Sequence, residues 1–227
     1  MEIKEAAATD IKAVIFDLDN TLLDRTNSFK SFASTLLNRY FGHLESHHQM
    51  LELIIQLDLD GYKDKRELFR ELLDELPWPI KPEHDELMNY YNEHYVKNAI
   101  LMDQALEVIR HTRNKYKTAL ITNGRNAIQY GKIDQLGIRA EFDFILVSEE
   151  AGYKKPDRRI FEAALTGMQL RPEQCIYVGD HPVNDIEGAF NAGLDTIWIK
   201  MNQPWREGLT AKPLHTIERL SELLVLI

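Results

Sequence analysis

Short apolar segments alternate with amphipathic segments over most of the chain. The apolar segments lack the alternation of half-buried strands, so each is interpreted as a strand buried on both faces. They occupy residues 13–16, 118–122, 144–147, 175–178 and 196–199. Helical spacing is found at residues 105–114, 127–136, 159–168 and 185–192, and Gly137, Gly167 and Gly193 stand where three of these helices should end. The pattern predicts an α/β fold, with a parallel sheet covered by helices on both faces.

The segment from residue 24 to residue 98 differs, because it contains no convincing strand. Helical patterns occupy residues 28–40, 47–56, 65–76 and 83–96, with a break at Pro77-Trp78-Pro79. We therefore expect an all-helical insertion at 24–98 between two core segments, 1–23 and 99–227. Ligands of open α/β sheets bind beyond the carboxyl ends of the strands. An insertion placed directly after the first strand is therefore expected to cover that edge as a lid.

Two aspartates, Asp17 and Asp19, follow the first apolar run. A carboxylate is costly to desolvate at a strand end unless a cation or a hydrogen-bond donor lies beside it. The pair is therefore a candidate reactive centre. Taken alone, it is equally well interpreted as turn or cap residues that end a strand.

Three later groups of polar residues also follow predicted strands or precede predicted helices. They are Thr122-Asn123-Gly124, Lys155 before Pro156, and Asp180 with Asp185. A hydroxyl, an amide and a flexible backbone at a helix entrance suit an anionic oxygen. Carboxylates without clustered histidine or cysteine favour Mg²⁺ over zinc. Mg²⁺ with carboxylates and a lysine is typical of phosphoryl transfer.

Charge and composition exclude several partners. The formal net charge of −9 argues against a nucleic-acid-binding surface or an anionic-membrane surface. No apolar run is long enough to span a bilayer, and the first ten residues lack the apolar stretch of a secretory signal. The single cysteine, Cys175, lies in an apolar run and fits a reducing compartment. We expect a cytoplasmic protein with no nucleic-acid or membrane partner, and the sequence does not indicate an oligomeric state.

The four groups, in this order and spacing, resemble the four motifs of the haloacid dehalogenase-like (HAD) superfamily. The motifs are Asp17-Leu-Asp19-Asn-Thr21, Thr122, Lys155-Pro156, and Gly179-Asp180 with Asp185. The resemblance spans essentially the whole chain. It implies a Rossmann-like catalytic core, and the insertion resembles the C1-type cap of the phosphatase branch.

The resemblance also implies roles. Asp17 is expected to attack phosphorus and become an aspartyl phosphate, and Asp19 to protonate the leaving alcohol and then activate water. Mg²⁺ is expected to bind the Asp17 side chain, the Asp19 carbonyl and Asp180. The expected phosphate-binding groups are Thr122, the Asn123 backbone and Lys155. Asp185 is expected to orient Lys155 or a water on the metal, with an alternative as a helix N-cap.

The expected activity is hydrolysis of a small phosphorylated metabolite. Dehalogenases of the superfamily lack the second aspartate, so Asp19 favours phosphate chemistry. Asn20 replaces a glycine common in sugar-phosphate and phosphoglycolate branches, and this variant resembles branches that act on nucleotides or acyl-sugar phosphates. The motifs assign no role to His181. Two alternatives stay open: a phosphomutase acting on sugar phosphates, and a non-catalytic binding module of the same fold.

Overall fold

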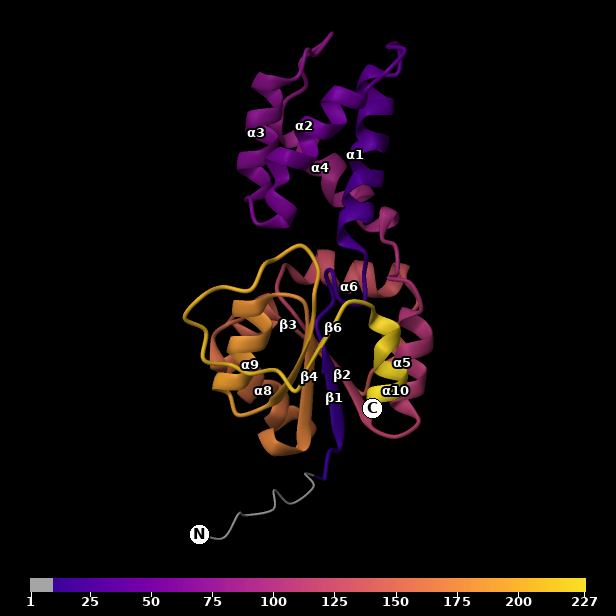
Figure 1. The fold of residues 1–227 in the computed structure, drawn as a ribbon. Helices are drawn as coiled ribbons and strands as arrows, with labels where there is room; N and C mark the ends of the chain where they lie inside the picture. The colour runs from indigo at the N-terminus through magenta and orange to yellow at the C-terminus, as the bar shows by residue number, and fades with distance from the viewer. Residues whose placement is uncertain (1–9) are drawn as a thin grey trace. The chain divides into compact units, whose positions relative to one another are not determined.

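The computed structural model describes residues 10–227 (Figure 1). Residues 1–9 of the expected core segment 1–23 lie outside the described residues. The chain forms two compact units: one ends at Leu23 and resumes as Leu101–Ile227, and the other is Asp24–Ile100. The second boundary therefore lies two residues beyond the expected position at residue 98. Among the described residues, no helix is both long and apolar enough to cross a membrane.

The first unit is built on a six-stranded sheet in the order β3-β2-β1-β4-β5-β6, and every pairing is parallel. The strands are β1 (Ala13–Phe16), β2 (Lys117–Thr122), β3 (Phe144–Val147), β4 (Cys175–Gly179), β5 (Asp195–Ile199) and β6 (His215–Ile217). The edge strand β6 was not predicted, because it has three residues and two of them are exposed. Such a strand has no apolar run to identify it.

Helices cover both faces of this sheet, which confirms the predicted fold class. In Figure 1, α8 and α9 lie on one side of the strands, and α5 and α10 on the other. The α-helices of this unit are α5 (Ala105–Arg113), α6 (Asn126–Gln135), α7 (Ser148–Ala151), α8 (Arg158–Met168), α9 (Gly188–Asn191) and α10 (Leu223–Leu226). Short helical turns complete it: η3 (Arg139–Glu141), η4 (Pro172–Gln174), η5 (Pro182–Glu187) and η6 (Leu220–Glu222).

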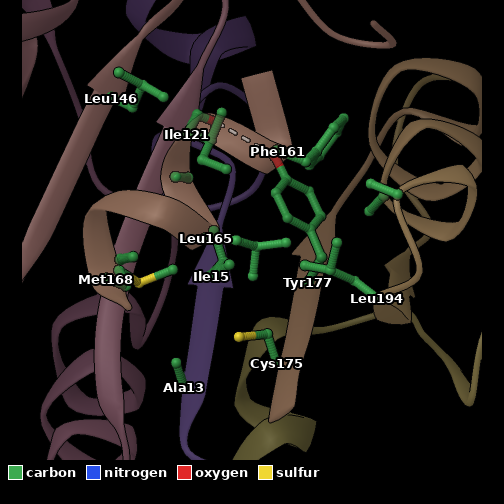
Figure 2. Packing of buried hydrophobic residues seen from close by; sticks show 14 of the residues in the cluster. Ala13, Ile15, Ile121, Leu146, Phe161, Leu165, Met168, Cys175, Tyr177 and Leu194 are labelled. Atoms are coloured by element: carbon green, nitrogen blue, oxygen red, sulfur yellow. Dashed lines mark hydrogen bonds between the residues drawn. The ribbon is translucent and has the colours of Figure 1, made fainter. Parts of the chain in front are cut away.

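Alternate residues of the central strands form the core that holds α8 and α9 against the sheet. Ala13 and Ile15 of β1 share one buried cluster with Phe161 of α8 and Leu194 (Figure 2). The Tyr177 ring lies in the same cluster, and its hydroxyl donates to the carbonyl of Ile121 at 3.2 Å. A buried tyrosine hydroxyl needs such a partner. Its position brings a polar atom to the upper end of the apolar core, beside the carboxyl end of β2.

The second unit is entirely helical. Its elements are α1 (Arg25–Phe41), α2 (His48–Asp58), η1 (Leu59–Gly61), α3 (Lys65–Glu75), α4 (His84–His94) and η2 (Val96–Asn98). Aromatic rings fill its core: Phe32 lies 5.5–6.5 Å from the ring centroids of Phe69, Tyr90, Tyr91 and Tyr95. These rings give the unit a core of its own.

Two details of the helical pattern differ from expectation. Gly167 was expected to end its helix, but α8 continues through it to Met168, and Gln169 forms the left-handed end with φ 58°. A Cβ at position 167 would meet the Phe144 ring, so this glycine serves close packing against β3. The expected helix at 185–192 begins earlier, as the η5 turn at Pro182, where the His181 side chain forms the N-cap.

Candidate active site

The polar residues expected to form a site gather at one edge of the sheet. Asp17 follows β1, Thr122 ends β2, and Asp180 follows β4. Since β2, β1 and β4 are adjacent parallel strands, their carboxyl ends lie side by side. The order of strands therefore brings together residues that are more than 160 positions apart in the chain.

A tight turn follows Asp17. The carbonyl of Leu18 accepts hydrogen bonds from Leu22 N at 2.9 Å and Leu23 N at 2.8 Å. Asn20 adopts φ 59°, a left-handed conformation that asparagine tolerates better than most residues. This conformation is a physical reason for asparagine at this position.

Lys155 is the buried cation at the centre of the group. Its Nζ lies 2.5 Å from Asp17 Oδ1, 2.7 Å from Asp185 Oδ1, 2.9 Å from the Tyr177 hydroxyl and 3.1 Å from the Ile121 carbonyl. The side chain is only 3% exposed. Its neighbour Lys154 is exposed. Tyr177 was missed by the sequence analysis, because a tyrosine in an apolar strand looks like any other core residue.

Burial and ion pairing act in opposite directions on the pKa values of Asp17 and Lys155. Burial raises the pKa of Asp17 from 3.8 to about 7; Lys155 opposes this rise, whereas Asp185 and Asp19 add to it. Burial on its own lowers the pKa of Lys155, but the carboxylates of Asp17 and Asp185 more than offset it. The pKa of Lys155 is therefore held well above its usual value, and the ammonium group stays charged.

Asp185 connects the lysine to the loop after β4. Its Oδ1 accepts from Lys155, and its Oδ2 accepts from the backbone N–H of His181 at 2.9 Å. The His181 Nδ1 accepts from the backbone N–H groups of Val183 and Asn184 at 3.1 and 2.9 Å. His181, and not Asp185, therefore caps this helical turn, which gives His181 a role that its sequence position did not indicate.

Asn123 ties the loop that carries Lys155 to the end of β2. Its side-chain oxygen accepts from Lys155 N at 2.8 Å, and its side-chain nitrogen donates to Lys155 O at 3.0 Å. This reciprocal pair fixes the backbone on both sides of the lysine side chain. Asn123 thus lies beside Lys155 through side-chain contacts that the sequence did not reveal.

Asp19 points to a different set of partners. Its Oδ2 accepts from Gln129 Nε2 at 2.8 Å, and its Oδ1 accepts from Lys132 Nζ at 2.7 Å. Gln129 also donates to the Thr122 hydroxyl at 2.5 Å. Neither Gln129 nor Lys132 was singled out from the sequence. The available signal was their spacing of three residues, on one face of the helix that follows Thr122-Asn123-Gly124.

The site offers a donor set that fits a divalent cation. Carboxylate oxygens of Asp17, Asp180 and Asp185 lie within 4.8 Å of one another, and all three residues are buried. Trp198 Nε1 donates to the Asp180 backbone carbonyl at 2.7 Å, which fixes the segment that carries this carboxylate. Hard, buried oxygen ligands of this kind are those that Mg²⁺ prefers.

The comparisons with known proteins agree on the family. A glyceraldehyde 3-phosphate phosphatase of Pyrococcus furiosus is 29% identical over 196 residues, covering 84% of this chain and 81% of the relative. The pyrimidine 5'-nucleotidase YjjG of Escherichia coli is 37% identical over 125 residues, 51% of this chain and 54% of its own length. Among solved structures, the magnesium-bound HAD-hydrolase YfnB of Bacillus subtilis has a TM-score of 0.77 and 25% identity, covering 95% of this chain and 98% of YfnB.

The family profile described as haloacid dehalogenase-like hydrolase matches residues 14–199, which is most of the chain. The match includes all four predicted motifs. It confirms the resemblance inferred from the sequence and the prediction that the protein is an enzyme. The chain therefore belongs to the haloacid dehalogenase-like hydrolases.

Proposed function

We propose that this hydrolase is a Mg²⁺-dependent phosphatase that acts on a small phosphorylated metabolite through an aspartyl phosphate at Asp17. The observation that carries the proposal is the buried Asp17 carboxylate in direct contact with Lys155, at the edge where four polar motifs meet. Relatives that are phosphatases of glyceraldehyde 3-phosphate and of pyrimidine nucleotides support the same reaction class.

In the first step, an Asp17 oxygen attacks phosphorus, and the bond from phosphorus to the ester oxygen breaks. Asp19 donates its proton to the leaving oxygen, so the alcohol departs neutral. The Thr122 hydroxyl, the Asn123 backbone N–H and the Lys155 ammonium hold the phosphoryl oxygens during the transfer. Asp185 keeps Lys155 directed at Asp17 by accepting a hydrogen bond from the same Nζ.

In the second step, water attacks the phosphorus of the aspartyl phosphate, and Asp19 accepts the proton of that water. The bond between phosphorus and Asp17 breaks, inorganic phosphate leaves, and the carboxylate of Asp17 is regenerated. A carboxylate suits this role because its acyl phosphate is readily hydrolysed.

The residues that would hold Mg²⁺ are Asp17 and Asp180 through their side chains and Asp19 through its backbone carbonyl. When bound, the cation supplies positive charge that offsets the repulsion between the carboxylate of Asp17 and an incoming phosphate dianion. The buried carboxylates of Asp17, Asp180 and Asp185 support this assignment.

The substrate class is part of the proposal. We infer a nucleotide or a sugar phosphate, with specificity set by the helical unit acting as a C1-type cap. A cytoplasmic location is also proposed, supported by the single cysteine. Cys175 is buried, and burial raises the pKa of its thiol to about 11.

A panel of nucleoside monophosphates, sugar phosphates and p-nitrophenyl phosphate, assayed with and without Mg²⁺, tests the activity. Acid-quenched enzyme should carry hydroxylamine-labile phosphate at Asp17, which borohydride reduction and mass spectrometry would locate. Asp17→Asn should lose turnover and the label, whereas Asp74→Asn, an exposed carboxylate of the helical unit, should keep both. A wild-type enzyme that turns over without phosphate on Asp17 would refute the mechanism.

The same panel separates the two alternatives. Conversion of a hexose 1-phosphate to its isomer, without release of inorganic phosphate, would replace the proposal with a phosphomutase. No turnover of any substrate with Mg²⁺ present would favour a non-catalytic module. The presence of all five residues Asp17, Asp19, Thr122, Lys155 and Asp180 in one unit argues against that second alternative.

A further inference from the structure

Two buried polar side chains of α6 have no part in the proposed mechanism. Gln129 and Lys132 lie three residues apart on one face of the helix, and they are 2% and 4% exposed. Lysine is rarely buried to this degree unless it is paired. The free energy needed to desolvate this ammonium group must therefore be offset by specific contacts.

These contacts converge on Asp19. Lys132 Nζ donates to one carboxylate oxygen at 2.7 Å, and Gln129 Nε2 donates to the other at 2.8 Å. Gln129 also reaches the hydroxyl of Thr122 at 2.5 Å. One face of one helix thus contacts both oxygens of the proposed acid–base group and a proposed phosphate-binding group.

The backbone before α6 is shaped to admit this arrangement. Gly124 has φ +150°, and a Cβ at this position would lie 2.7 Å from Gln129 Cγ and 2.9 Å from Gln129 Cδ. Any other residue would push the Gln129 side chain out of its place. The glycine of Thr122-Asn123-Gly124 therefore makes room for the side chain that contacts Asp19 and Thr122.

We propose that Gln129 and Lys132 are positioning residues that fix the rotamer of the Asp19 carboxylate for proton transfer. This inference rests on the proposed function, because it assigns Asp19 the proton-transfer role. The Asp19 side chain is 25% exposed, and it follows a strand end on a tight turn. Two donors from a neighbouring helix hold this carboxylate where a surface aspartate would otherwise sample several rotamers.

The competing explanation is that Lys132 and Gln129 only stabilise the fold. A stabilising role predicts the same fractional loss of rate with every substrate. A positioning role predicts a loss that depends on the leaving group, because p-nitrophenolate leaves without help from an acid and an alkoxide does not. The leaving-group dependence therefore separates the two explanations.

The experiment measures the rate of enzyme phosphorylation in a single turnover, with Mg²⁺ present. Lys132→Met keeps the length of the side chain and removes its charge, and Lys132→Arg retains the charge. Lys154→Met, which removes an exposed lysine next to Lys155, is the matched control. Rates are measured for p-nitrophenyl phosphate and for an alkyl phosphate that the wild-type enzyme hydrolyses.

We expect Lys132→Met to slow phosphorylation by the alkyl phosphate about 10–100-fold, since general acid–base catalysis contributes about 10²–10⁴-fold in total. The rate with p-nitrophenyl phosphate should change by less than about 3-fold, in keeping with its weak need for an acid. Lys132→Arg should recover part of the loss, and Lys154→Met should match the wild type. In an Asp19→Asn background, Lys132→Met should cause no further loss, because the two residues act through one carboxylate.

Equal losses with both substrates, or additive losses in the double variant, would overturn the inference. If Lys132→Met fails to fold, as judged by its thermal unfolding, Gln129→Met carries the same comparison. A wild-type enzyme that shows no phosphorylation of Asp17 would instead refute the proposed function. The two failures are therefore distinguishable.

Discussion

Replacing Asp17 by asparagine should stabilise the protein at pH 8 when a chelator removes divalent cations. Burial raises the pKa of this carboxyl from 3.8 to about 7, so the folded state keeps a proton that the unfolded chain has lost. The free energy of unfolding should therefore fall as the pH rises from about 4 to about 7 and then level off. Asparagine is neutral at every pH and should not show this decline.

The size of the effect follows from the difference between the two pKa values. A rise of about 3 units at about 1.4 kcal/mol per unit corresponds to roughly 4 kcal/mol above pH 7. This figure is an upper bound, because water entry and relaxation reduce the cost of a buried ion. Lys155 keeps its contacts with Asp185, Tyr177 and Ile121 in the variant, so its charge stays paired. In a chain of this size, the melting temperature should rise by at most roughly 8–16 °C.

The assay is thermal unfolding, followed by circular dichroism in EDTA between pH 4 and pH 8. Wild type, Asp17→Asn and Asp74→Asn are compared, the last making the same chemical change at a side chain that is 76% exposed. Asp74→Asn should stay within about 0.5 kcal/mol of the wild type at each pH. A variant Asp17→Asn that is less stable than the wild type at pH 8 would show that Lys155 outweighs burial, and the reasoning would be wrong.

Three further changes test the fold and the site. Loss of a residue that only hydrogen-bonds a metal ligand lowers metal affinity by roughly 10–100-fold. Asp180→Asn should raise the Mg²⁺ concentration needed for half-maximal activity by more than this, because Asp180 is proposed as a direct ligand; an unchanged Mg²⁺ titration would remove Asp180 from the ligands. Tyr177→Phe should cost about 0.5–1.5 kcal/mol in urea unfolding, because the hydrogen bonds of the hydroxyl are lost while Lys155 keeps its other three acceptors; a neutral result would mean that water replaces the hydroxyl. Gly167→Ala should cost about 1–3 kcal/mol, because its methyl group would meet the Phe144 ring; unchanged stability would show that the ring can move.

Local hydrophobic patterns in the sequence predicted much of the core and the positions of the motifs. Continuous apolar runs identified five of the six strands, because a strand buried on both faces needs no polar alternation. The same runs located Asp17, Thr122 and Asp180 at strand ends, and the parallel arrangement implied a common edge. The strand β6 was not predicted, because three residues, two of them exposed, show almost no hydrophobic pattern. Gly167 was misinterpreted, because a glycine that serves packing looks the same in sequence as one that ends a helix.

The contacts among the site residues depend on how the elements pack. Asp19 meets Gln129 and Lys132 across more than 100 residues of chain, through side chains that the pattern of α6 alone cannot direct. His181 became a helix cap, and Asp185 a partner of Lys155, only once the turn after β4 adopted its shape. Hydrophobic periodicity records which face of an element is buried. Hydrogen bonds of 2.5–3 Å between side chains distant in the sequence form only in the packed structure, because the packed backbone fixes the position of each donor and acceptor atom.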